Sequence, residues 1–360
     1  MTRITDSVSL IKRLSLAFGP SGCEDNVKEI IKELAAHLCD DMITDRLGNL
    51  ICKMSFGDKS ADGRKRIMIA AHTDEVGFMI DGIRSDGMLT FGCVGGIDPS
   101  VLAGRKVHVG NEKGLLRGVI CSKAIHHKEK DEREKPIPAD KMYIDLGFSS
   151  KEEAEEKIGI GDFGTFDSEF YRIGKDGCMI KGKALDDRMG CAAMIEIMSE
   201  LSVIRPEVDV DVYFCFTVRE EIGYSGAAAA ASRVKPDIAV VLESTAIGDI
   251  PKTEAHRRVA DVGEGVVISV ADRATIYDRD TVERAMKLAE DCGVSAQIKR
   301  YVSGGNDAGK IHKAIDGIRV LALSVPTRYL HSPSCVAAID DYIDARELAK
   351  NIVIKNFMFI

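Results

Sequence analysis

The 360-residue chain contains no tryptophan, and only 6% of its residues are aromatic. No apolar run approaches the ~20 residues that span a bilayer, so we expect no membrane partner. The amino-terminal stretch carries Asp6 and Ser7 where an export signal needs its apolar centre, which predicts a cytoplasmic protein. The ten cysteines include no Cys-x-x-Cys pair. Neither a cysteine zinc site nor a disulfide scaffold is therefore expected.

Charge of either sign is not concentrated. The formal net charge is −8 with both signs mixed along the chain, which argues against a nucleic-acid partner. Apolar residues make up 45% and charged residues 29%, values typical of a globular protein with a sizeable core. The length suggests two domains.

Both ends of the chain alternate between helical and strand patterns. Such alternation indicates an α/β fold with a mostly parallel sheet sandwiched by helices. Apolar periodicity predicts helices over 7–17, 24–38, 187–201, 224–234, 280–292 and 341–355, and strands over 42–54 (two, around a turn), 67–71, 208–218, 237–242 and 319–325.

A different pattern occupies the middle of the chain. Glycine becomes frequent, and short alternating runs at 77–83, 88–93, 106–109, 116–121 and 142–146 predict a small β-barrel-like unit. We therefore expect a discontinuous main domain (1–75 and 167–360) and an inserted β-rich domain (76–166). The charge run at 127–135 is expected to be a solvated loop, with His126 and His127 as loop histidines rather than ligands.

The buried run at 67–71 ends at His72, and Asp74 follows two residues later. In extended backbone these side chains lie on the same side. A metal-ligating histidine commonly donates a hydrogen bond from its other ring N–H to a carboxylate. Further acidic or imidazole groups follow other predicted strands or open a helix: Asp186, Glu220, Glu221, Glu243 and His331. In open α/β sheets this edge binds ligands.

Two histidines with three or four carboxylates suit two divalent ions such as zinc, cobalt or manganese. The adjacent residues Glu220 and Glu221 could have different roles, since one can bind a metal ion while the other acts as general base. The alternatives are a solvated glutamate pair, and helix capping by Asp186 or Asp187, which leaves the other free to ligate. The GGNDAG loop is either a turn that caps a helix or a substrate-facing loop, through Asn306 and Asp307.

Several segments together resemble the dinuclear metallo-aminopeptidases that form tetrahedral dodecamers (the TET or glutamyl/deblocking aminopeptidases, metallopeptidase family 42). They are AHTDEVGFMI, EREKPIPADKMYIDLGFSSKEEAE, GKALDDRMGC, TVREEIGYSGA, LESTAIGDIP, GGNDAG and RYLHSP. The resemblance implies a zinc-exopeptidase-like fold, short peptide substrates, two divalent ions per subunit, and a homo-oligomer whose dimers form through the insert.

The resemblance also implies roles for individual residues. His72 and His331 would be metal ligands, Asp186 the bridging ligand, and Asp74 the partner of His72. Glu220 would be the general base. Glu221 and Glu243 would complete the ligand set, although some family members carry Asp where this chain has Glu243.

Three other functions compete with the aminopeptidase interpretation. An endoglucanase-type glycoside hydrolase needs only two carboxylates, but the scarcity of aromatic residues argues against sugar-stacking platforms. An N-acyl amino acid deacylase could use a similar two-metal site. A binding protein without catalysis is the third alternative, and the intact Glu220 argues against it.

Overall fold

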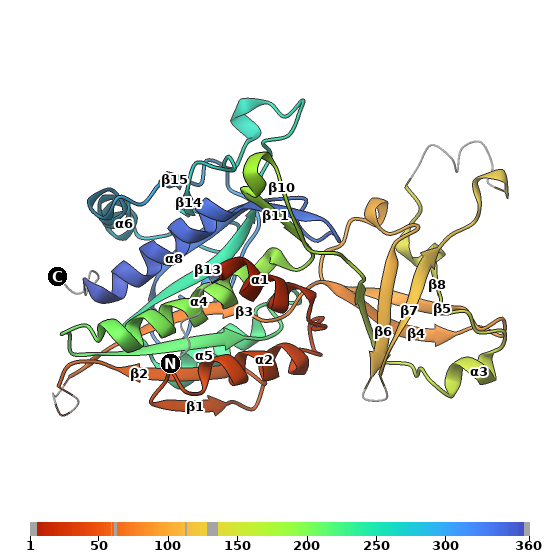
Figure 1. The fold of residues 1–360 in the computed structure, drawn as a ribbon, viewed down its shortest axis with the longest axis horizontal. Helices are drawn as coiled ribbons and strands as arrows, with labels where there is room; N and C mark the ends of the chain where they lie inside the picture. Colours follow the sequence, from red (N-terminus) through yellow and green to blue (C-terminus); the bar gives the residue numbers. More distant parts are fainter. Residues whose placement is uncertain (1–5, 59, 61–62, 112–113, 128–135, 356–360) are drawn as a thin grey trace.

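The computed structural model describes residues 6–58, 60, 63–111, 114–127 and 136–355. An α/β body carries a smaller β-barrel at one end (Figure 1). The α/β fold with an inserted barrel confirms the prediction from sequence.

One mixed sheet of eleven strands forms the α/β body. Its strands are β1 (Asp41–Thr44), β2 (Leu50–Ser55), β3 (Lys65–His72), β10 (Tyr171–Ile173), β11 (Met179–Gly182), β12 (Val210–Thr217), β13 (Ile238–Ala246), β14 (Val266–Ile268), β15 (Ala296–Ile298), β16 (Arg319–Arg328) and β17 (Cys335–Ala338). The order is β1-β2-β12-β3-β13-β16-β17-β11-β10, and β14 joins β15 to β16. The four central strands, β12, β3, β13 and β16, are parallel, whereas β1, β2, β17, β11 and β10 pair antiparallel at the flanks.

Helices cover both faces of this sheet. They are α1 (Ser7–Leu16), α2 (Asp25–Ala35), α4 (Leu185–Ile204), α5 (Ser225–Val234), α6 (Arg279–Cys292), α7 (Ala308–Ile311) and α8 (Ile339–Ile354). Helix α4 packs against β3, β13, α1 and α8 (Figure 1). Helices α5 and α7 contact each other, and α5 packs against β12 and β3 while α7 packs against β13 and β16. Because α4 lies between the sheet and other helices, it is apolar and buried nearly all round.

The barrel closes six strands in the order β4-β5-β8-β7-β6-β9. Their bounds are β4 (Gly77–Ile83), β5 (Leu89–Val94), β6 (Lys106–Asn111), β7 (Gly114–Cys121), β8 (Tyr143–Asp145) and β9 (Phe163–Phe166), and α3 (Lys151–Glu155) packs beside β4. The ring of Phe78 meets Phe91 and Phe166 edge-to-face, with centroids 5.3 and 5.2 Å apart. The domain boundaries at 76 and 166 stay a prediction.

The predicted loop histidines lie on the barrel side of the molecule. His126 and His127 are exposed in a 3₁₀ turn, and neither belongs to a described group of metal-ligating side chains. The rest of the predicted charged loop, 128–135, lies outside the described residues.

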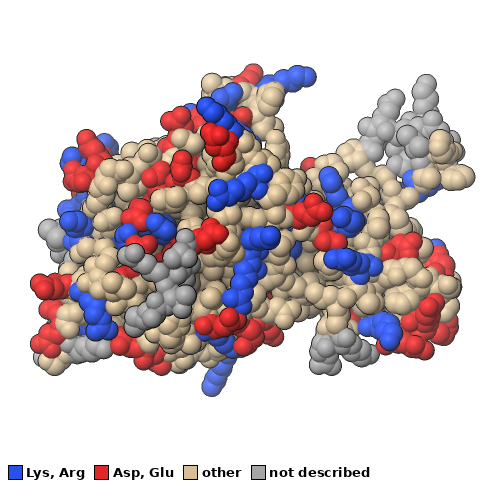
Figure 2. All heavy atoms as spheres, in the orientation of Figure 1, with Lys and Arg blue, Asp and Glu red and all other residues tan. Residues whose placement is uncertain are grey.

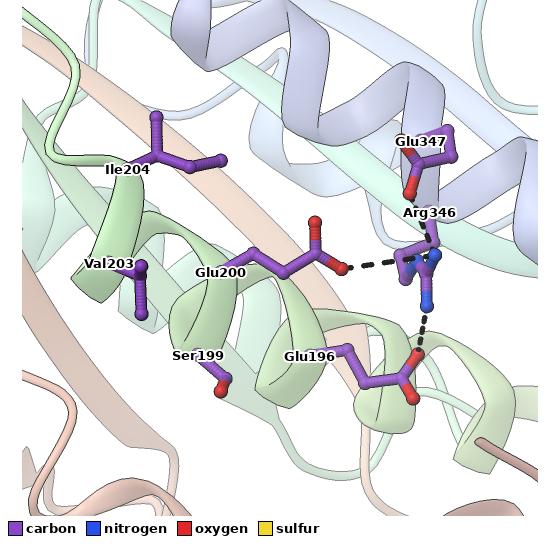
Figure 3. A pocket seen from close by; sticks show the side chains of 7 residues that line it. All are labelled: Glu196, Ser199, Glu200, Val203, Ile204, Arg346 and Glu347. Atoms are coloured by element: carbon purple, nitrogen blue, oxygen red, sulfur yellow. Dashed lines mark hydrogen bonds and ion pairs between the residues drawn. The ribbon is translucent and has the colours of Figure 1, made fainter. Parts of the chain in front are cut away.

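Figure 2 shows basic and acidic side chains interspersed over one face. A hollow between α4 and α8 holds Arg346 among Glu196, Glu347 and Glu200, at 2.9, 2.7 and 3.8 Å (Figure 3). These opposite charges link the two helices, which is a structural role. No helix in the described ranges is long and apolar enough to cross a membrane.

Candidate active site

A cleft of about 530 Å³ opens at the carboxyl ends of the central parallel strands. Residues predicted from the sequence line it: Asp186, Glu220, Glu221, Glu243, Asn306 and His331. Gly96 and Asp98, which follow barrel strand β5, also line it. The barrel therefore contributes to the rim of the cleft.

The strands place the site residues at different depths. His72 is the last residue of β3, and Glu220 and Glu221 follow β12. The sequence predicts that Glu243 follows its strand, but this expectation is wrong. Strand β13 continues to Ala246 because its pairing with β16 extends past Glu243, which lies opposite Ser324.

Asp186 lies between the two histidines. Its Oδ1 is 3.4 Å from Nε2 of His72, and its Oδ2 is 3.4 Å from Nε2 of His331. Among the described ion pairs, each Nε2 atom has one further carboxylate nearby. Glu243 Oε2 lies 3.8 Å from His72 Nε2, and Glu221 Oε2 lies 3.3 Å from His331 Nε2. The side chains thus form two clusters that share one carboxylate.

Asp187, the neighbour of Asp186, has a different environment. It is fully buried and accepts the backbone N–H of Gly190 at 3.0 Å, as a residue at the start of a helix does. Asp187 also offers an oxygen within 4.8 Å of His72 and Glu243 ligand atoms. Only Asp186 contacts both histidines among the described ion pairs, and the ligand role of Asp186 stays a prediction.

The Nδ1 atoms of both histidines face backbone carbonyl oxygens. His72 Nδ1 lies 3.1 Å from the carbonyl of Asp74, and His331 Nδ1 lies 2.6 Å from the carbonyl of Gly96. A carbonyl only accepts, so each Nδ1 carries a proton, and either ring in its neutral form would present the Nε2 lone pair to the cleft. This is the orientation that a metal-ligating histidine requires.

The carboxylate of Asp74 does more than the sequence suggests. It lies 3.5 Å from His72 Nδ1, farther than the Asp74 carbonyl. Its oxygens accept the backbone N–H groups of Glu220 and Glu221, each at 3.1 Å, and the hydroxyl of Ser21. Asp74 therefore holds the glutamate pair as well as His72.

The site concentrates buried negative charge. Burial raises the pKa of Glu220, Glu221 and Glu243. Burial also disfavours charge on Asp186 and His331, but their contact outweighs it: the pKa of Asp186 falls to about 2 and that of His331 rises to about 11.

Three buried oxygens of this cluster, Asp186 Oδ1, Asp187 Oδ2 and Glu243 Oε1, have no hydrogen-bond partner in the described parts of the chain. An orphaned buried acceptor is costly. The oxygen and imidazole donors are those that borderline divalent ions prefer. The residues present therefore fit the predicted metal ions.

Backbone strain gathers around the same residues. Arg219, immediately before Glu220, and His331 itself adopt positive φ angles of 59° and 56°. Ala184, Tyr224 and Tyr329 do the same nearby, at 48°, 62° and 59°. Such conformations cost on the order of 1–3 kcal/mol each for non-glycine residues and are typical of functional sites.

The 304–309 loop combines both predicted roles. Gly304, Gly305 and Asn306 line the cleft, and the Asn306 side chain accepts the N–H of Ala308 at the start of α7. Asp307 does not line the cleft: its side chain is fully buried and accepts the Thr217 hydroxyl at 2.6 Å, and its substrate-binding role stays a prediction. Asp307 therefore supports the end of β12.

Sequence reasoning misses other lining residues, notably Tyr224, Thr245 and Lys299. Tyr224 occupies the quoted TVREEIGYSGA segment, so its closeness to Glu220 could have been noticed. Lys299 lies in a short strand region with no motif around it, and only the folded chain brings it to the cleft.

Comparison with known proteins identifies the relatives of this chain. The model of the M42 glutamyl aminopeptidase family matches residues 48–348. A TET aminopeptidase structure from the marine sediment archaeon Thaumarchaeota archaeon SCGC AB-539-E09 is 35% identical, with a TM-score of 0.92, over 98% of this chain and 97% of that one. The Pyrococcus horikoshii TET1 peptidase, described as assembling into a tetrahedron or a large octahedral shell, is 34% identical, with a TM-score of 0.85, over 96% and 99%.

Two relatives differ in the substrates that their names give. A lysyl aminopeptidase from Pyrococcus furiosus is 28% identical over 96% of this chain and 96% of its own. A glutamyl aminopeptidase from Lactococcus lactis subsp. cremoris is also 28% identical, over 95% and 94%.

The fold, the paired His and carboxylate clusters and these likenesses define a metal-dependent aminopeptidase. Within that class, the chain belongs to the M42 glutamyl aminopeptidase family.

Proposed function

We propose that this chain removes amino-terminal residues from short peptides at a centre of two divalent ions, with Glu220 as the general base. The observation that carries the proposal is the position of Asp186, whose two oxygens face the Nε2 atoms of His72 and His331 at equal distances of 3.4 Å.

We infer two ligand sets from these distances. His72, Asp186 and Glu243 would hold one ion, and Asp186, Glu221 and His331 the other. When bound, two divalent ions supply Lewis-acid chemistry that polarises a peptide carbonyl and acidifies water. Zinc is the ion that best suits these donors, and cobalt or manganese could replace it.

Glu220 is suited to move the proton. It lines the cleft, its side chain is buried, and burial raises its pKa above the ordinary glutamate range. A carboxylate with a raised pKa is a stronger base, so it can take a proton from the attacking water and deliver it to the leaving amine. The N–H of Glu220, held by Asp74, fixes the backbone that carries this side chain.

His72 and His331 act by orientation. Each ring is fixed by a carbonyl at Nδ1, one from Asp74 and one from Gly96. Because Gly96 lies after barrel strand β5, the barrel fixes one ligand of the site. The inserted unit is thus part of the proposed active centre.

We infer a dimer formed through the barrel, and a tetrahedral dodecamer built from such dimers, because the solved TET1 peptidase assembles into closed shells. A cytoplasmic location fits this assignment.

The substrate class can be tested with chromogenic amino-acid anilides. Metal-replete protein should cleave anilides that have a free amine and should cleave their N-acetylated forms poorly. Rapid hydrolysis of N-acetyl amino acids with no anilide turnover would favour a deacylase instead.

A further inference from the structure

A second hollow, of about 250 Å³, lies where the barrel meets the α/β body. Its lining comes from the start of β6, from the segment 167–171, from β11 and from the loop that follows His331. Among the described residues, none lines both this hollow and the candidate active-site cleft. The hollow is therefore a separate feature, which the proposed peptidase chemistry does not use.

Lys181 is a buried cation in the wall of this hollow. It lies on β11 and is 9% exposed. Its ammonium donates to the Ser168 hydroxyl at 2.8 Å and to the Glu169 backbone carbonyl at 2.9 Å, and it lies 5.3 Å from the centre of the Tyr171 ring. These partners are uncharged, and the described residues place no carboxylate within ion-pair distance of the ammonium. Because an ammonium has three donors, one N–H is left for a ligand.

Two exposed cations from the barrel line the same hollow, Arg105 and Lys106. Arg105 donates its Nε hydrogen to the Val101 carbonyl at 3.0 Å. Neither side chain has an ion pair among the described residues. Burial lowers the pKa of Lys181, and the charges of Arg105 and Lys106 lower it further, against the attraction of Glu169. An anion held between the three cations would relieve both the burial cost and this repulsion.

Two carboxylates also line the hollow, those of Asp167 and Glu169. Asp167 lies 3.7 Å from Arg117, which lies outside the hollow, and Glu169 is exposed to solvent. Solvent screens an exposed charge much more than a buried one. The buried ammonium of Lys181 therefore sets the sign of the field at the inner wall, and an anion is favoured there over a cation.

The hollow is connected to the loop that carries His331. Ser168, which accepts from Lys181, donates its own hydroxyl hydrogen to the carbonyl of Pro333 at 2.6 Å. Pro333 also lines the hollow, together with Ser334. A ligand held here would therefore join three segments: the start of β6, strand β11 and the loop after His331.

The three cations match an anion with several acceptor oxygens. A phosphate group has three such oxygens and about −1.5 to −2 charge at neutral pH, and both arginine and lysine bind phosphate. We propose that this hollow binds a phosphate group, either free phosphate or the phosphoryl group of a small ester, with Lys181 as its buried anchor. The proposal does not depend on the proposed peptidase activity.

Calorimetric titration of inorganic phosphate into the full-length, metal-replete protein at low ionic strength tests the proposal. The unaltered protein should show saturable binding. Lys181→Met should weaken it by about 10–100-fold, the range for losing a hydrogen bond to a charged group. Lys181→Arg keeps the charge and should restore part of the affinity. Phosphate could also bind to the metal ions, but Lys181→Met would not weaken that binding, so an unchanged affinity in this variant would overturn the proposal.

Lys106→Gln and Arg117→Gln form a matched pair that does not depend on how well a core variant folds. Both residues are exposed cations of the barrel, but only Lys106 lines the hollow. Lys106→Gln should weaken phosphate binding, whereas Arg117→Gln should leave it unchanged. Equal weakening by both substitutions would indicate a general effect of net charge and would overturn the proposed site.

Two further ligands identify what is bound. Glycerol 3-phosphate that binds more tightly than inorganic phosphate, in a Lys181-dependent manner, would assign the hollow to a phosphate ester, and the reverse order would assign it to free phosphate. Acetate has the same kind of oxygen but less charge, and it should bind at least ~10-fold more weakly than phosphate if charge-assisted contacts select the ligand. Acetate binding as tight as that of phosphate, or no saturable binding of either phosphate compound, would overturn the proposal.

Discussion

The carboxylate of Asp74 accepts the backbone N–H of Glu220 at 3.1 Å. The same residue faces His72 through its carbonyl. The turn after β3 therefore fixes both a proposed ligand and the proposed base, which come from separate strands.

Asp74→Asn should test this double role. An amide cannot accept from both backbone N–H groups of the glutamate pair, so the Glu220 loop should lose part of its support. Changes to groups that orient metal ligands cost about 10–100-fold in metal affinity or activity. We expect kcat to fall in this range, measured on protein of known metal content. Ser21→Ala removes only one donor to Asp74 and should have a smaller effect.

Substitution should distinguish the roles of the two adjacent glutamates. Glu220→Gln should keep both ions and lower kcat by ~10²–10⁴-fold, because it removes the general base. Glu221→Ala should lose metal, because Glu221 contacts His331 at the second cluster. Metal analysis by mass spectrometry together with kcat distinguishes them. Metal loss in Glu220→Gln with full occupancy in Glu221→Ala would reverse the assignment.

A buried ion pair should stabilise the segments on either side of the site. Lys183 Nζ lies 2.5 and 2.7 Å from the oxygens of Glu75, which also accepts the hydroxyl of Thr165 from barrel strand β9. Removing one partner of a buried pair costs about 3–5 kcal/mol. Glu75→Gln should lower the free energy of unfolding, measured with denaturant, by an amount of this order.

The exposed pair Arg84–Asp86 provides the control. Asp86→Asn should leave the free energy of unfolding nearly unchanged, because solvent screens an exposed pair. If Glu75→Gln proved as mild as Asp86→Asn, the buried pair would not link these segments.

The barrel should control assembly. Phe78 pairs with Gly164, so the ends of the insert lie side by side and a short Gly/Ser linker can replace residues 77–165. We expect the truncated protein to fold but not to dimerise by light scattering. It should also lose activity, because the Gly96 carbonyl no longer orients His331. Normal assembly of this variant would exclude the barrel as the dimerisation element.

The sequence predicts the central strands well, for a physical reason. Strands β3, β12, β13 and β16 are buried on both faces, so they appear as long apolar runs. Strands such as β9, β14 and β15 have three or four residues and are held by their neighbours, which leaves little local signal. The sequence therefore does not predict the closing strand of the barrel or the flank formed by β10, β11 and β17, although it does predict the two strands around a turn at 42–54 that pair as β1 and β2.

Prediction of the site residues from local sequence is limited in the same way. Histidines and carboxylates at strand ends can be found from the sequence, because buried charge there needs a reason. The roles of Asp307 and Lys299 depend on which loop faces the cleft, and that is set by tertiary packing. Their spacing in the sequence carries no such information.

Metal removal tests the central claim most directly. Metal analysis and aminopeptidase activity should be measured on the same preparation, before and after a chelator and after addition of zinc, cobalt or manganese. We expect two ions per subunit, loss of activity as they leave, and recovery as they return, with the melting temperature following occupancy because the ions bind the folded state. Full activity in rigorously metal-free protein would contradict the proposed two-metal mechanism.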